Sequence, residues 1–270
     1  MRSLRRFVSV RMIAPLAVVL AAVTGSCTDI GTSPTTITSL EFDSLPFPAV
    51  VTGDTLRDSL GRAAPLHAIA FNAAGGVVPN PSITYIALDS GLTIDPTGIV
   101  TAQLRNGTVR LIASVPGLQS VAETLVVARR PDSVIVTPPL VDTLAFTIPD
   151  SAAQNVTPTL ALRVATRDTA GGIGGTQGWL VSYRVLYHGR LLALTDTTVA
   201  TLWNGNGQPA LVDTTAADGS VAPKLRVRST LLPTTPDSIT VVATVRYRGA
   251  PVPGSPVTYV IQIHPKVKAH

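Results

Sequence analysis

The sequence is poor in the residues on which most catalytic and metal sites depend. Its 270 residues include one cysteine and four histidines, and only 14% are charged. A lone cysteine excludes an internal disulfide, and the histidines lack the paired spacing that binds zinc. They are His67, His188, His264 and His270. No Gly-x-Ser-x-Gly motif is present to expose a serine nucleophile. We therefore expect a protein that is not an enzyme and that has no cofactor and no metal site.

Aromatic residues are also scarce, at 4%, whereas proline and glycine are frequent, with 22 and 21 copies. Proline interrupts helical hydrogen bonding and β-branched residues fit a pleated sheet, so this composition favours strands and turns. The clearest strand spans 108–115. Its apolar face consists of Val109, Leu111, Ala113 and Val115, and its opposite face of Thr108, Arg110, Ile112 and Ser114. Many such runs between turns predict an all-β protein built from sandwiches of two packed sheets.

The formal net charge of +5 comes mainly from the N-terminus. Four of the 21 basic residues lie in residues 1–26, which contain no acid, so the rest of the chain has 17 basic and 16 acidic residues. A nucleic-acid-binding surface needs a concentration of positive charge. We therefore expect no nucleic-acid partner.

Residues 1–26 have the layout of a secretory signal peptide, with a basic start, an apolar run from Met12 to Val23 and small residues before Cys27. The apolar run is shorter than the roughly 20 residues that a membrane-spanning helix needs. With a Gly-Ser pair directly before the cysteine, the segment resembles a bacterial lipoprotein signal. The resemblance implies that Cys27 is lipidated and anchors the protein in a membrane. The alternative is an ordinary signal peptide cut nearby, which would leave a free thiol at Cys27.

Residues 27–37 are polar and contain glycine and proline, so we expect the lipidated cysteine to be followed by a flexible tether. In lipoproteins, an aspartate directly after the cysteine favours retention at the inner membrane, and this chain has Thr28 there. The resemblance therefore implies an exported protein anchored in the bacterial envelope, at the outer membrane rather than the inner one.

Residues 38–129 contain strand-like runs between turns, and the stretch 83–127 has the most specific pattern. We expect four short strands in it. The pattern in it runs from an aromatic strand with Tyr85 through a turn at 95–98 to a glycine-led strand ending at Ala113 and a valine-rich closing strand. In this order they resemble the bacterial immunoglobulin-like domains of group 2 and of the invasin and intimin type. The resemblance implies a first immunoglobulin-like domain over 38–129.

A charged break with a proline at 129–132 follows, and proline stops strand pairing. Residues 132–270 contain roughly eight strand-like runs, enough for a larger sandwich. The most regular runs are 179–187 and 257–263, each with one apolar face. The turn at 218–221 resembles the same superfamily. We therefore expect a second, larger immunoglobulin-like β-sandwich domain over 132–270.

Two kinds of residue are candidates for a ligand surface. Trp203 adjoins a turn rich in glycine and asparagine, whereas Trp179 lies on an apolar strand face and is expected in the core. Six arginines occupy outward-alternating strand positions, and the last four are the candidates for a ligand surface: Arg163, Arg184, Arg226, Arg228, Arg246 and Arg248. If they share one sheet, they form a basic face for an anionic polysaccharide or lipid head group; otherwise they are separate solvated side chains.

Calcium is a further alternative, because Asp132, Asp213 and Asp218 lie in expected loops, although no spaced acidic loop motif supports it. The sequence thus predicts a non-enzymatic, lipid-anchored cell-envelope protein whose immunoglobulin-like domains serve as a structural spacer or as an adhesion module. Its expected partners are the membrane, through Cys27, and a protein or polysaccharide at the cell surface. The alternative function is that of a polysaccharide-binding module.

Overall fold

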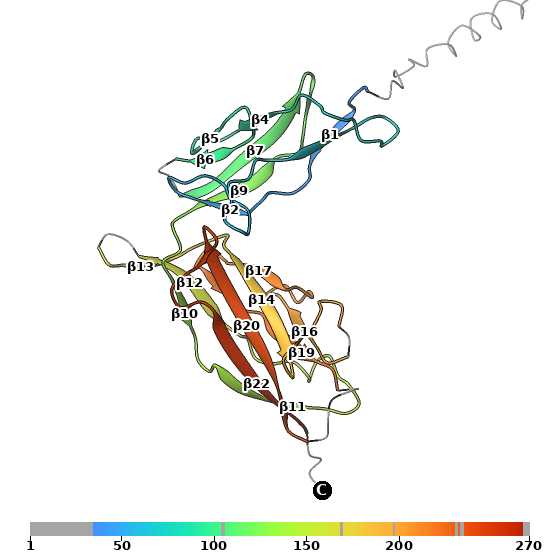
Figure 1. Ribbon diagram of the computed structural model, residues 1–270, viewed down its shortest axis with the longest axis vertical. Coiled ribbons are helices and arrows are strands. Elements are labelled where there is room, and N and C mark those ends of the chain that lie inside the picture. The colour runs from blue at the N-terminus through green and yellow to red at the C-terminus, as the bar shows by residue number, and fades with distance from the viewer. Residues whose placement is uncertain are drawn as a thin grey trace, which may run out of the picture.

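The computed structural model describes residues 35–103, 106–167, 170–196, 198–229, 232 and 235–266. Within these residues every regular element is a β-strand, which confirms the predicted all-β fold (Figure 1). No helix among them is long and apolar enough to cross a membrane. The expected signal peptide and Cys27 lie outside the described residues.

Strand pairing divides the described chain into two groups of sheets (Figure 1). The first group contains β1 (Ser39–Phe42), β2 (Ala49–Val51), β3 (Ala68–Phe71), β4 (Thr84–Ala87), β5 (Leu92–Ile94), β6 (Val100–Ala102), β7 (Gly107–Val115), β8 (Leu118–Gln119) and β9 (Glu123–Ala128). Its main sheet has the order β2-β9-β7-β4, with β8 beside β7, while β1 pairs with β3 and β5 with β6. β2 is parallel to β9, and the other pairs are antiparallel.

The second group contains β10 (Ser133–Val136), β11 (Val141–Phe146), β12 (Leu162–Arg167), β13 (Ile173–Gly175), β14 (Leu180–Tyr187), β15 (Arg190–Leu191), β16 (Ala200–Trp203), β17 (Val212–Thr214), β18 (Ser220–Val221), β19 (Lys224–Val227), β20 (Asp237–Tyr247), β21 (Ala250–Pro251) and β22 (Val257–Pro265). The largest sheet has the order β11-β22-β20-β14-β15, and another has the order β10-β12-β13. β16 and β19 form a separate ribbon. β11 runs parallel to β22.

The two groups meet at the charged break in the sequence. Within the described residues, no strand of the first group pairs with a strand of the second. β9 ends at Ala128 and β10 begins at Ser133. The chain therefore leaves one set of sheets and enters the next within the segment 129–132.

The core of the second group follows the alternation seen in the sequence. Apolar side chains on one face of β14, β20 and β22 are buried, including Val181, Val185, Val241, Ile261 and Ile263. Tyr259 is 1% exposed, and its hydroxyl donates a hydrogen bond to the Ala161 carbonyl over 3.0 Å. Burying each large apolar side chain stabilises the fold by about 1.5–3 kcal/mol relative to leaving it exposed, before the entropy of ordering is counted.

The stretch 83–127 contains more strands than expected. It includes β4 to β8 and most of β9, because turns at positive-φ glycines, such as Gly91 and Gly117, cut it into shorter pieces. The predicted turn at 95–98 is present: the Asp95 carboxylate accepts hydrogen bonds from the backbone N–H groups of Thr97 and Ile99 over 2.8 and 3.0 Å. The turn therefore explains the aspartate without any catalytic role.

Ile112 differs from the expectation for its strand. Alternation places it on the polar face of β7, yet it is only 5% exposed. β7 lies between β9 and β4, and Ile86 of β4 is directly opposite Ile112. A side chain in a central strand is covered by its cross-strand neighbours even on the outer face of a sheet.

Candidate functional site

The structure does not bring the four candidate arginines together. Arg226 and Arg228 lie on or directly after β19, whereas Arg246 and Arg248 lie at the end of β20 and in the turn beyond it. β19 and β20 belong to different sheets. The four side chains therefore do not form one basic face, and the two pairs have different surroundings.

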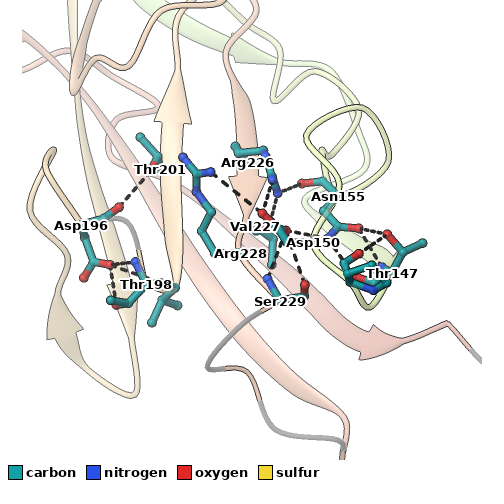
Figure 2. A network of polar contacts seen from close by, with 12 residues as sticks. Thr147, Asp150, Asn155, Asp196, Thr198, Thr201, Arg226, Val227, Arg228 and Ser229 are labelled. Atoms are coloured by element: carbon teal, nitrogen blue, oxygen red, sulfur yellow. Dashed lines mark hydrogen bonds and ion pairs between the residues drawn. The ribbon is translucent and has the colours of Figure 1, made fainter.

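Arg226 is the largest departure from the sequence-based expectation. Alternation places it outward, but it is 1% exposed. The segment 155–157 lies alongside β19 and is hydrogen-bonded to it. The Thr157 N–H donates to the Leu225 carbonyl over 3.0 Å, and the Val227 N–H donates to the Asn155 carbonyl over 2.9 Å. Figure 2 shows Asn155 of this segment and Asp150 of the loop before it lying against the Arg226 guanidinium. Alternation reports which face a side chain occupies, and it does not report what covers that face.

A polar network holds the buried guanidinium (Figure 2). Arg226 Nη2 lies 2.5 Å from Asp150 Oδ2, and Nη1 donates to the carbonyl groups of Val227 and Asn155. Asn155 Nδ2 also donates to Asp150 over 2.9 Å. The hydrogen bond from Arg226 is the main reason that the pKa of Asp150 falls to about 2, with burial acting in the opposite direction. We call these residues the Arg226 clamp; it is a structural device that fixes the segment 147–157 to β19.

Trp203 lines a hollow beside the Arg226 clamp. It is the last residue of β16 and pairs directly with Lys224 of β19. Trp203 is half-buried and Lys224 is exposed. The hollow has a volume of about 440 Å³. Its walls include Ala153, Val156, Thr157, Gly205, Gly207 and Ala222. Lys224, which sequence reasoning did not select, is thus the cation paired directly with Trp203 across the ribbon.

The second cluster of interest lies between the two groups of sheets, around Asp54. Asp54 follows β2 and is 7% exposed. Its carboxylate accepts hydrogen bonds from Arg57 Nη2 over 3.1 Å, from Arg248 Nε over 2.9 Å and from the Tyr247 hydroxyl over 2.9 Å. Burial alone would raise the pKa of Asp54, but these hydrogen bonds hold the pKa well below its ordinary value. The hydrogen bond from Arg248 lowers the pKa most. Because Arg57 belongs to the first group and the other two partners to the second, Asp54 connects them.

Aromatic side chains complete this connection. The ring centroids of Phe47 and Trp179 are 4.9 Å apart, and those of Trp179 and Tyr247 are 5.9 Å apart. Trp179 is 5% exposed, as its strand face predicts, and its Nε1 donates to the Arg246 carbonyl over 3.0 Å. The free space among these residues is only about 30 Å³, which is the volume of about one water molecule. The cluster is therefore a closely packed joint.

Two glycine contacts show how closely the backbones approach in the joint. A Cβ placed on Gly61 would overlap the backbone of Gly249. A Cβ placed on Gly178 would lie 3.1 Å from Val126 and 3.2 Å from Ala49. We refer to Asp54 and its partners, the three aromatic rings and these glycine contacts as the Asp54 joint.

The three aspartates considered for calcium each accept backbone hydrogen bonds, and Asp213 lies in β17 rather than in the expected loop. Asp132 accepts a hydrogen bond from the Arg167 N–H over 2.9 Å, and Asp218 from the Ser220 N–H over 2.9 Å. Asp213 accepts one from the Thr214 N–H over 2.9 Å. In the part of the chain that the structure describes, no group of three or more potential metal ligands comes together.

Neither a known protein family nor a curated protein matches the sequence. Among solved structures, domains 4 and 5 of the S-layer protein SbsC match 84% of this chain and 98% of that chain, with 13% identity and a TM-score of 0.30. The Yersinia pseudotuberculosis adhesin InvE matches 83% of this chain and 58% of its own, with 12% identity and a TM-score of 0.31. Mouse clustered PcdhgC3 EC1-3 matches 68% of this chain and 54% of its own, with 12% identity and a TM-score of 0.32. At these values the likenesses assign no function to the chain.

Proposed function

We propose that this protein is an exported, non-enzymatic lipoprotein of the bacterial envelope, most specifically of the outer membrane. Two immunoglobulin-like domains of the group 2 or invasin-intimin type, over 38–129 and 132–270, form a stiff spacer that presents an adhesion surface. The observation that carries this proposal is the Asp54 joint. A spacer must hold an orientation between its parts, and the joint supplies contacts that resist bending.

The physical character of the joint supports stiffness. Domains connected by small, polar interfaces normally move relative to each other. Here a buried carboxylate is shared by Arg57, Arg248 and Tyr247, and Phe47 packs against Trp179 beside it. Bending the joint would separate the desolvated carboxylate from Arg248 and Tyr247, its donors in the second group, and taking partners away from a buried charge is costly.

The anchor is proposed from the sequence around Cys27. Several acyl chains together make membrane attachment durable, whereas one chain gives only marginal binding. Metabolic labelling with an alkyne fatty acid tests the anchor. We expect labelling and membrane fractionation of the wild type, and loss of both in Cys27→Ser. Ser26→Ala is the matched control, because it keeps a small residue before the cysteine and should remain labelled. An unlabelled wild type, or a Cys27→Ser variant that is still labelled, would overturn the anchor.

A further inference from the structure

The geometry points to a saccharide-binding site in the hollow around Trp203, with an acidic sugar as its ligand. This inference goes beyond the spacer function and depends on neither Cys27 nor the Asp54 joint. It rests on an aromatic platform, a rigid surround and a positive charge, all on one face of the β16–β19 ribbon.

The platform consists of Trp203 and Lys224. Because they are paired residues of neighbouring antiparallel strands, their side chains leave the ribbon on the same face and lie next to each other. No aromatic ring among the described residues packs on the Trp203 indole. The hollow beside it, at about 440 Å³, falls within the range of about 300–1,000 Å³ typical of small-molecule sites. A sugar ring presents an apolar C–H face and a polar edge, so it suits a flat indole with an ammonium group at its side.

The rim of the hollow is a hydrogen-bonded turn. Asn204 Oδ1 accepts from the N–H groups of Asn206 and Gln208, each over 3.0 Å, and the Gly207 N–H donates to the Asn204 carbonyl over 2.9 Å. A Cβ placed on Gly207 would meet nothing within 4 Å, so space is open beside the backbone there. A ligand can therefore approach main-chain groups at this rim without meeting a side chain.

The opposite wall is held in place by the Arg226 clamp. Ala153, Val156 and Thr157 line the hollow and belong to the segment that the clamp fixes to β19. The rim and this wall are both fixed by hydrogen bonds before any ligand arrives. Such preorganisation reduces the entropy lost on binding.

The charge near the hollow favours an anion. No carboxylate among the described residues forms an ion pair with Lys224. Arg226 and Arg228 follow on the same face of β19, and they share a single carboxylate, that of Asp150. Asp213 lies behind the rim, with Oδ2 3.3 Å from the Gly205 N–H. Lys224 is the one charged residue among the described residues that line the hollow, and its ammonium group attracts a carboxylate-bearing sugar such as a uronic acid.

Calorimetry on the full chain in detergent tests the inference, with oligomers of galacturonate, mannuronate and hyaluronan as probes. Each has a carboxyl-reduced counterpart of the same linkage and no charge. We expect at least one acidic oligomer to bind saturably, and its reduced counterpart to bind roughly tenfold more weakly or not at all. Absence of binding by every acidic oligomer at millimolar concentration would overturn the proposal, and equal binding of the reduced counterpart would overturn the assignment of an acidic sugar.

Variants locate the site. Trp203→Ala should abolish binding, Trp203→Phe should retain part of it, and Lys224→Gln should weaken it roughly three- to tenfold and remove its salt dependence. Lys266→Gln changes an exposed lysine elsewhere and should have no effect. If Trp203→Ala does not fold, as judged by its thermal transition, Trp203→Phe and Lys224→Gln decide the question. Wild-type affinity in either of those two variants, or in a folded Trp203→Ala, would place the ligand elsewhere.

Discussion

Asp54 and Arg248 are 194 positions apart in the sequence, yet Arg248 Nε donates to the Asp54 carboxylate over 2.9 Å. The two residues belong to different groups of sheets. This contact makes the orientation of those groups depend on one carboxylate, and that dependence can be measured.

Replacing Asp54 with asparagine should loosen the joint. The amide keeps the shape of the carboxylate but removes its charge, so Arg57 and Arg248 lose their ionic partner. Because both arginines are partly exposed, with side chains 28% and 53% accessible, we expect a loss of about 1–2 kcal/mol rather than the larger cost of a fully buried pair. Spin labels placed on the two groups should show a broader distance distribution.

Glu41→Gln is the matched control for that measurement, because Glu41 is an exposed carboxylate on β1, away from the joint. It should leave the distance distribution unchanged. A distribution in Asp54→Asn as narrow as that of the wild type would show that the aromatic and glycine contacts alone fix the orientation.

Arg226→Ala should be among the most destabilising substitutions in the second group. It leaves a cavity and leaves Asp150 without its main partner, and breaking a buried pair in this way typically costs about 3–5 kcal/mol. The double variant Arg226→Met with Asp150→Asn removes both charges and should recover most of that loss. Both tryptophans lie in the second group, so urea unfolding followed by indole fluorescence reports on it. A double variant no more stable than Arg226→Ala would contradict this account.

The pKa of Asp150 predicts an acid-sensitive part of the stability. Its folded-state pKa is about 2, below the ordinary value of 3.8, so the unfolded state binds a proton more readily. The contribution is therefore complete above about pH 4 and lost as the pH falls toward about 2. The difference in unfolding free energy between the wild type and Asp150→Asn should shrink by about 1–2 kcal/mol between pH 5 and pH 2. A difference that stays constant over this range would show that the ion pair does not control stability.

Gly98 should tolerate alanine poorly, and Gly117 serves as the control that separates backbone strain from steric contact. Both have positive φ, at 86° and 83°. A Cβ on Gly98 would lie 3.1 Å from the Tyr85 ring, whereas one on Gly117 would meet nothing within 4 Å. Gly117→Ala should therefore cost only the backbone strain of about 1 kcal/mol, and Gly98→Ala should cost more. Hydrogen exchange of peptides from β4 and β7 measures both; equal protection in the two variants would show that the ring contact adds no cost.

Local patterns predicted the strands and their buried faces because alternation is a property of neighbouring residues. Val181, Tyr259 and Trp179 are buried where the sequence placed them. Arg226 was predicted to be exposed, but it is buried. The segment that covers it contains Asp150, which comes 76 positions earlier in the sequence. The Asp54 joint was not predicted either, because its residues are also far apart in the sequence. No local pattern around Asp54 indicates contact with Tyr247 or Arg248. Trp203 was predicted as a ligand-surface residue from the turn beside it. Its pairing with Lys224 depends on the register of β16 and β19, which could not be predicted from the sequence.

The parallel pairs of strands have a mechanical consequence. In each group a strand near the beginning lies parallel to the last one, β2 beside β9 and β11 beside β22. A force that pulls the chain ends apart along the strands slides such neighbours past each other, so their cross-strand hydrogen bonds carry the load together. An antiparallel hairpin pulled from its open end loses its bonds one at a time. In the second group this shear-loaded pairing extends from Val141 to Phe146, and Phe146 is fully buried at its end. A protein tethered at one end and bound at the other would therefore transmit tension through its longest parallel pair before its sheets separate.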